Sequence, residues 1–172
     1  MIRVPERTEA APYYFKYIDQ VANGDIRQTL EAQFSETLLL LRSISDEASL
    51  HRYAPDKWSI RQVVSHVNDT ERLFVFRALW FARGLEPAQP SFDQDVAVAN
   101  SGADGRSWPS HIEEFRGVRA ATVAFFQDLP EEAWGRTGVA SGHPVTVRAL
   151  AYMTAGHVKH HLTLLRERYL QS

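Results

Sequence analysis

Three of the seven histidines of this 172-residue chain fall within five residues, in the stretch TAGHVKHHLTLLRERYL. On a helix, His157 and His161 are four residues apart and lie on one face, inside the apolar stripe. His160 is turned toward the side of Lys159 and Glu167. Two imidazoles at this spacing form a common metal clamp, as in H-E-x-x-H, although the glutamate of that motif is absent here. The spacing fits a metal site and a pair of buried, hydrogen-bonded histidines equally well.

A third histidine is predicted to face the same core. His66 lies in RQVVSHVNDTERLF, where an inward stripe at helical spacing includes Thr70 and Phe74. A single inward histidine is more often a core residue than a ligand, but here two helices each turn histidine inward. Each unpartnered ring nitrogen of a buried imidazole costs roughly 1–3 kcal/mol. One metal ion bound by all three histidines would remove three such costs. His66, His157 and His161 are therefore the predicted metal ligands.

The composition excludes several classes of site. The chain has no cysteine, which excludes disulfides, thiolate ligands and a cysteine nucleophile. Its net charge of −2 gives no electrostatic reason to bind nucleic acid or an anionic membrane surface. No apolar run approaches the roughly 18 residues of a membrane span, and MIRVPERTEAAPYY lacks the apolar core of a signal peptide, so we expect a cytoplasmic protein. Phosphate-binding glycine loops and a G-x-S-x-G elbow are also absent, which disfavours nucleotide binding and serine hydrolysis.

The histidines need helices that turn them into a common core. Apolar residues at helical spacing predict a single all-α domain over residues 1–172, a four-helix bundle, with residues 1–11 flexible. Long helices are expected at about 25–43, 59–84, 109–128 and 146–170, after a short opening helix at 12–20. The expected start signals are Asp25, the capping-box pairs Ser59–Gln62 and Ser110–Glu113, and Thr146, and Gly84 is a natural stop.

The segment between the second and third long helices is expected to be a long loop. Residues 85–108 are rich in Pro, Gly, Asp and Ser, and a loop of this length is often functional. It is long enough to cross over, so the bundle need not be simple up-and-down. Asp93 in this loop either lines a site entrance or forms a turn. The stretch GRTGVASGHPVT is predicted to be a loop or a tight hairpin, and no longer strand is expected.

Two segments together resemble a known family. KWSIRQVVSHVNDTERLF followed by AGHVKHHLTLLRERY resembles the DinB/YfiT-like family, in particular its YfiT and bacillithiol-transferase branch. FDQDVAVANSG and FRGVRAATVAFFQDLPEEAWGRTG extend the resemblance over about residues 12–170. The resemblance implies a four-helix bundle and a divalent metal, zinc or nickel, on one histidine of the second helix and two of the last. Mapped by motif these are again His66, His157 and His161, and the same resemblance suggests a homodimer.

Three histidines with open coordination positions are typical of a catalytic metal site rather than a structural one. The resemblance implies a low-molecular-weight thiol, such as bacillithiol, mycothiol or glutathione, as co-substrate. The leading hypothesis is therefore a metal-dependent thiol S-transferase that conjugates the thiol to small electrophiles. Two alternatives stay open: a metal-dependent hydrolase that uses metal-bound hydroxide, and a non-catalytic, stress-related metal-binding module.

Other side chains have weaker claims to a role. A hydrolase would need a base or proton shuttle, for which Asp69, Glu71 and His160 are candidates, although a solvated helix position explains each of them better. Trp58 opens the second helix beside the expected pocket, where it could contact substrate or anchor the core. Arg119 could steer an anionic thiol carboxylate, but a surface ion pair is the better interpretation.

Overall fold

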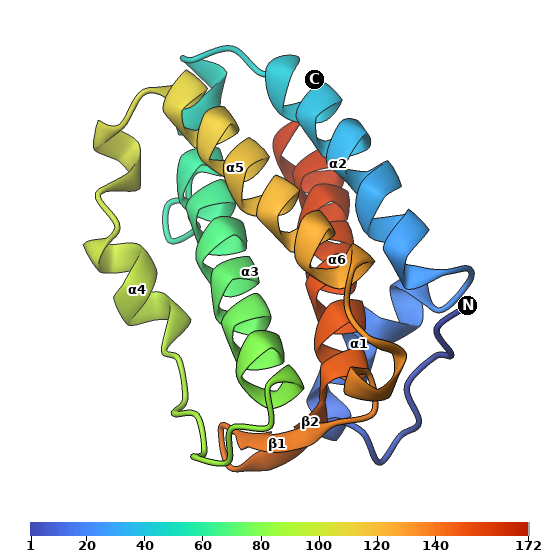
Figure 1. The fold of residues 1–172 in the computed structure, drawn as a ribbon. Coiled ribbons are helices and arrows are strands. Elements are labelled where there is room, and N and C mark those ends of the chain that lie inside the picture. Colours follow the sequence, from blue (N-terminus) through green and yellow to red (C-terminus); the bar gives the residue numbers. More distant parts are fainter. Residues whose placement is uncertain (172) are drawn as a thin grey trace.

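The computed structural model describes residues 1–171, which are mostly helical (Figure 1). The helices and strands are α1 (Phe15–Ile18), α2 (Ile26–Arg42), α3 (Ile60–Ala82), α4 (Gln94–Asn100), α5 (Trp108–Gln127), β1 (Thr137–Ala140), β2 (His143–Thr146) and α6 (Val147–Leu164). Single 3-10 turns lie at Pro12–Tyr14, Asp19–Val21, Ala48–Leu50, Ala103–Gly105 and Glu131–Ala133, and the π-helical turn Leu165–Tyr169 continues α6. None of the described helices has the length and apolar character of a membrane span.

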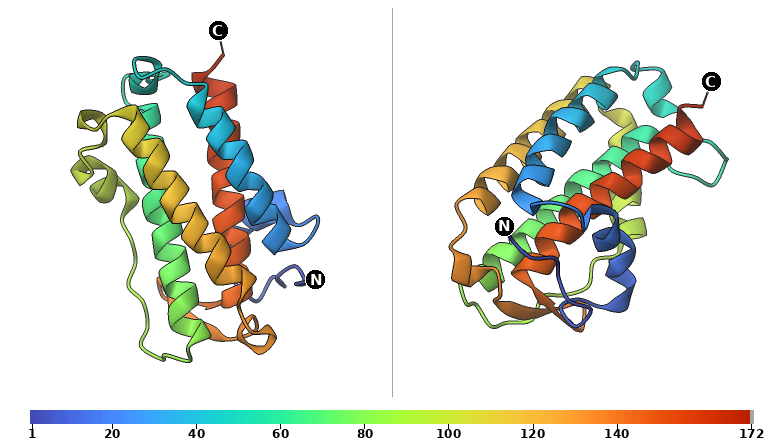
Figure 2. Two further views of the ribbon diagram at one scale, coloured as in Figure 1. Left: turned by 45° about the horizontal axis from the view of Figure 1, so that its top comes forward. Right: turned by 90° about the vertical axis from the view of Figure 1, so that its right-hand side faces the viewer.

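Four of the helices form the bundle. α2 packs against α5 and α6, and α3 packs against the same two helices from the other side. Figures 1 and 2 show that α2 and α6 run in one direction and that α3 and α5 run in the other. Because α3 and α5 are parallel neighbours, the chain between them must return along the whole bundle. The predicted four-helix bundle with a long crossover is therefore confirmed.

The crossover is more ordered than a loop. It contains α4, whose N-cap is Asp93, and the carboxylate of Asp93 accepts hydrogen bonds from the backbone N–H groups of Asp95 and Val96. The residue that we expected to form a turn or line an entrance thus starts a short helix. The sequence did not predict α4, because a helix of about two turns is too short to show a clear apolar period and the segment around it is rich in turn residues.

The predicted start signals hold for three of the four long helices. Asp25 caps α2, Ser59 and Gln62 form the capping box of α3, and Thr146 caps α6. The Ser110–Glu113 capping box predicted for α5 is wrong, since α5 begins at Trp108. Pro109 suits that first turn because its missing N–H would have no partner within the helix. The carboxylate of Asp46 accepts a hydrogen bond from the free backbone N–H of Trp108.

The N-terminal segment, which we expected to be flexible, packs against the bundle. Ile2 is only 3% exposed, and its carbonyl accepts a hydrogen bond from the hydroxyl of Tyr152 in α6. Glu9 is buried and forms an ion pair with Arg148. The expected flexibility of residues 1–11 is therefore not observed, because Ile2 and Glu9 each have a specific partner on α6.

A two-stranded hairpin closes one end of the bundle. β1 and β2 pair antiparallel, and the two residues between them, Ser141 and Gly142, have φ angles of 52° and 78°. Positive φ at both positions is the requirement of a type I′ turn, which fits the twist of a hairpin. The backbone of Gln89 hydrogen-bonds Val139 and Ser141, so the crossover is tied to the hairpin edge. The strands are four residues each, so of the two predicted forms, a loop or a tight hairpin, the hairpin is the one observed, and "all-α" leaves it out.

Candidate metal centre

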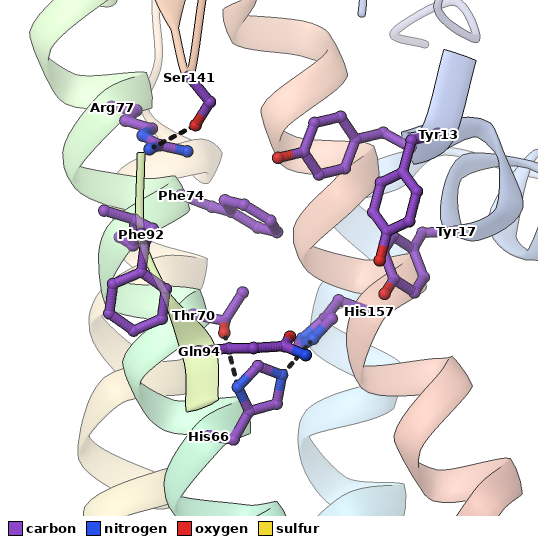
Figure 3. Close-up of a pocket in the computed structure, with 12 residues that line it drawn as sticks. Tyr13, Tyr17, His66, Thr70, Phe74, Arg77, Phe92, Gln94, Ser141 and His157 are labelled. Carbon is purple, nitrogen blue, oxygen red and sulfur yellow. Dashed lines mark hydrogen bonds between the residues drawn. The ribbon is translucent and has the colours of Figure 1, made fainter. Parts of the chain in front are cut away.

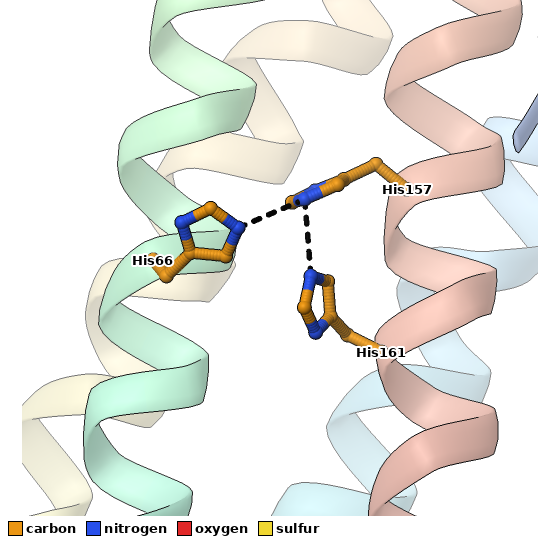
Figure 4. A group of neighbouring side chains, drawn as sticks. All are labelled: His66, His157 and His161. Carbon is orange, nitrogen blue, oxygen red and sulfur yellow. Dashed lines mark hydrogen bonds between the residues drawn. The ribbon is translucent and has the colours of Figure 1, made fainter. Parts of the chain in front are cut away.

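The three predicted histidines come together in the middle of the bundle (Figure 4). His66 projects from α3, and His157 and His161 project from successive turns of α6. The Nε2 atom of His157 lies 3.0 Å from Nε2 of His66 and 3.1 Å from Nε2 of His161. The side chains are only 4%, 4% and 8% exposed, in the order His66, His157, His161. Three imidazoles from two helices therefore direct one nitrogen each to a common point.

These nitrogens cannot satisfy one another. A neutral imidazole nitrogen carries either one hydrogen or one lone pair, so Nε2 of His157 cannot form two full hydrogen bonds. Two nitrogens bound tetrahedrally to one zinc ion at about 2.0–2.1 Å would lie about 3.3 Å apart, close to the two separations observed. The residues present thus fit a divalent cation, which would bind all three lone pairs.

Burial holds the imidazoles in the form that binds metals. Burial lowers the pKa of His66 to about 4. Burial also lowers the pKa of His157 and of His161 well below the ordinary value, and the neighbouring histidines lower both further. All three rings are therefore neutral near pH 7, with lone pairs available for coordination.

Aromatic rings from two other segments hold the cluster in place. Trp58, just before α3, lies with its ring centroid 5.0 Å from that of His66, and Tyr17 of α1 lies 5.3 Å from His157. Tyr17 can come this close because α6 has a glycine at the crossing point. A Cβ on Gly156 would lie 2.2 Å from the carbonyl oxygen of Tyr17. Gly156 thus permits the contact between α1 and α6, and α6 continues through it as one helix.

A cavity of about 200 Å³ adjoins the cluster (Figure 3). His66 and His157 line one end of it, and Arg77 and Ser141 line the other, about three helical turns away along α3. Aromatic side chains supply much of the wall between the ends: Tyr13, Tyr14, Tyr17, Phe74 and Phe92. Among residues 1–171, no aspartate or glutamate lines this cavity. The histidines therefore face a small space with aromatic walls and an arginine at its far end.

The predicted acid–base candidates lie outside the cavity. Asp69 is on α3, where its side chain is 35% exposed and faces Arg72, and burial raises the pKa of its carboxyl group. His160 is half-buried on the flank of α6, with its ring against Tyr17 and His161. As predicted, His160 points away from the common nitrogen site. Trp58 contacts His66, so its position beside the site agrees with the sequence interpretation.

Arg119 and Glu71 are not surface residues, and both interpretations of Arg119 were wrong. Arg119 is fully buried, forms a two-bond ion pair with Glu71, and does not line the cavity. The inner face of α5 is not purely apolar, because Arg119 lies on it beside Phe115 and Thr122. An arginine at an inward position needs a buried partner, and here that partner lies on another helix.

The sequence interpretation missed Arg77, although a signal for it was present. Arg77 continues the inward stripe of α3 that runs through His66, Thr70 and Phe74, and a charged residue within such a stripe is unusual. The contribution of Tyr17 to the cavity had no such signal, because α1 reaches the site only through its packing on α6.

Comparisons with known proteins place this architecture in a family. A solved structure similar to this chain is YfiT from Bacillus subtilis, described as a probable metal-dependent hydrolase with an unusual four-helix bundle topology. The two chains are 17% identical over 95% of this chain and 89% of YfiT, with a TM-score of 0.73, which establishes a similar fold. No curated protein matches the chain. The sequence profile of the DinB superfamily matches residues 29–165, most of the chain and all three histidines, so the chain belongs to the DinB superfamily.

Proposed function

We propose that this protein is a metal-dependent thiol S-transferase that conjugates a low-molecular-weight thiol to small electrophiles. His66, His157 and His161 would hold one divalent cation, zinc or nickel. The observation that carries the proposal is the convergence of three buried Nε2 atoms, two of whose rings line a cavity of about 200 Å³. A cation bound there would lower the pKa of a thiol and stabilise the thiolate, which is the nucleophilic form.

The chain's own residues would bury the reacting groups and hold the ligands. The neutral imidazoles are oriented by their neighbours, since Trp58 packs on His66 and Tyr17 packs on His157. The aromatic wall of the cavity would exclude water from a nucleophile at the histidine end. The chain also has no cysteine, so no thiol of its own competes for the cation.

A metal-dependent hydrolase is the second candidate, because YfiT is described as one. Hydrolysis needs a group that takes a proton from water close to the reacting atoms. Within the described chain no carboxylate lines the cavity, and Asp69 and His160 lie to the side of it. A free thiol has a pKa of about 8.5, against about 15.7 for water, so it releases its proton to solvent more readily and depends less on such a base. This difference favours thiol transfer.

The proposal also includes a cytoplasmic homodimer, in line with the YfiT-like resemblance of the sequence. Low-molecular-weight thiols are reduced in the cytoplasm, which suits such a reaction. Light scattering of the purified protein would measure the mass, and a single 19.6 kDa species at micromolar concentration would exclude the dimer.

The first test is metal content by elemental mass spectrometry on tag-free wild type, His161→Ala and His160→Ala protein. We expect about one metal ion per chain in wild type and His160→Ala, and none in His161→Ala. Turnover is then followed with monochlorobimane, with and without glutathione, bacillithiol or mycothiol. Thiol-dependent turnover that His161→Ala abolishes supports the proposal.

The other outcomes identify the alternatives. Metal-dependent hydrolysis of 4-nitrophenyl acetate without any added thiol, together with no bimane conjugation, would indicate a hydrolase. Bound metal with neither activity would indicate a non-catalytic metal-binding module. Wild type that stays metal-free after reconstitution with zinc and nickel would leave three core histidines and no mechanism for either enzyme.

A further inference from the structure

We propose that the cavity binds a small carboxylic acid, with the guanidinium of Arg77 as the anchor for the carboxylate. The proposal names a substrate class for this site. That the bound acid is a substrate rests on the proposed function. The apolar body of the acid would lie along the aromatic wall, and its electrophilic centre would face the histidine end.

Arg77 is buried but only partly bonded. Its side chain is 2% exposed, and it lines the cavity at the end opposite His66 and His157. Nη2 donates hydrogen bonds to the carbonyl of Pro90, at 2.6 Å, and to Oγ of Ser141, at 3.2 Å. Nε has no hydrogen-bond partner among residues 1–171. The hydroxyl of Tyr14, on the cavity wall, also interacts with the guanidinium. None of these groups is a carboxylate, so none compensates the positive charge.

The other buried arginines of residues 1–171 show what is missing. Each of them forms an ion pair with a carboxylate: Arg61 with Asp46, Arg119 with Glu71, and Arg148 with Glu9. No carboxylate of the described chain lies within ion-pair distance of Arg77 (the ion pairs of residues 1–171 all involve other cations). A buried charge without a counter-charge is strongly unfavourable unless something pairs with it. The position of Arg77 on the cavity wall points to a ligand as the source of that counter-charge.

The size and lining of the cavity define the rest of the ligand. A cavity of about 150 Å³ holds a benzene-sized molecule, so about 200 Å³ suits a ring with one acidic substituent. Phe74 and Phe92 lie between the two ends and supply apolar rings against which such a body can pack (Figure 3). Arginine is the side chain that best matches the planar geometry of a carboxylate. The chemistry of the cavity is therefore that of a small aromatic or similarly compact organic acid.

The test uses benzoate as the probe and benzamide as its neutral counterpart, with affinities measured by isothermal titration calorimetry on the zinc-loaded and the metal-free protein. We expect wild type to bind benzoate at least tenfold more tightly than benzamide in both forms. Arg77→Gln should weaken benzoate at least tenfold, leave benzamide within about twofold, and leave the metal content unchanged. Arg72→Gln, an exposed arginine on the same helix, is the matched control and should change neither affinity.

The outcomes separate this proposal from the proposed function. Equal binding of benzoate and benzamide by wild type, or binding of neither, overturns the proposal without any variant, so poor folding of Arg77→Gln cannot obscure the result. A preference for benzoate that survives Arg77→Gln but disappears in metal-free protein also overturns it, because the carboxylate then binds the cation. A preference that depends on Arg77 in a protein that never binds metal supports the acid site and removes the metal-dependent function.

Discussion

Two polar clusters lie in the core of the same bundle and differ in how well the chain satisfies them. In the first, Arg119 bonds both carboxylate oxygens of Glu71, at 2.8 and 2.7 Å, and the amide oxygen of Gln33 at 3.1 Å. The amide nitrogen of Gln33 in turn donates to the carbonyl of Ala155, so the cluster links α2, α3, α5 and α6. In the second, three imidazoles direct nitrogens to one point where they cannot satisfy one another.

This difference separates residues that hold the fold from residues that await a ligand. α3 supplies both clusters, with Glu71 in the first and His66 in the second, so the contrast does not come from the helix or its depth in the core. A complete buried network makes one arrangement of the four helices specific, whereas an incomplete one costs stability unless a bound group completes it. We therefore expect mutations in the two clusters to affect different measurable properties.

The largest expected effect is the loss of the first cluster. Arg119→Met leaves Glu71 buried without its partner, and we expect it to lower the free energy of unfolding by about 3–5 kcal/mol. Urea denaturation measures this change. The matched control is Arg116→Met on the same helix, whose ion pair with Glu113 is exposed and should contribute under about 1 kcal/mol. Equal effects of the two changes would show that the Arg119 cluster does not hold the bundle together.

The second cluster should respond to metal rather than to mutation alone. Free zinc at about one hundred times its dissociation constant should stabilise wild type by about 2.7 kcal/mol, because a ligand that binds only the folded state adds this amount. Thermal unfolding with and without chelator measures it. His161→Ala should lose this stabilisation and His160→Ala should keep it. A melting temperature that is the same with and without zinc would contradict the prediction.

The packing that places Tyr17 over His157 gives a smaller effect. Gly156→Ala would place a Cβ 2.2 Å from the Tyr17 carbonyl, so α1 must shift, and we expect a loss of about 1–3 kcal/mol. Gly117→Ala is the control, since nothing lies within 4 Å of a Cβ at that helical position. It should stabilise the protein by about 0.5–1 kcal/mol. If both changes stabilise, the close contact between α1 and α6 is not required.

The smallest expected effect concerns the pair of Glu9 and Arg148 near the end of the bundle. Burial alone would raise the pKa of Glu9, but hydrogen bonds from Arg148, the Glu6 backbone and Thr146 outweigh it and hold the pKa below the ordinary 4.5. Because the folded-state pKa is lowered, the pair stabilises fully above the unfolded-state pKa, and this contribution is lost as the pH falls below about 4.5. Urea denaturation from pH 6 to pH 3 should show a shallower decline for Glu9→Gln than for wild type, and parallel declines would refute this.

Much of the candidate site could be read from local pattern. The four-residue spacing of His157 and His161 and the apolar stripe around His66 predicted their inward directions, and the structure agrees. Asp25, Ser59 and Thr146 started helices as their side chains predicted, because capping depends on neighbours within one turn. The predicted start of α5 was wrong, because no side chain caps this helix locally and the free N–H of Trp108 bonds to Asp46, which is distant in the sequence.

The sequence alone determined the direction of each side chain, because the helical period turns it either toward the core or toward solvent. The three histidines, Arg77 and Arg119 all lie on stripes that face the core. What only the tertiary structure decided is whether each inward polar group meets a partner. Arg119 meets Glu71 and Gln33, whereas Arg77 meets neutral oxygens and a cavity. The physical reason is that the period of a helix is a local property, while the partner across the core depends on how two helices are positioned along each other.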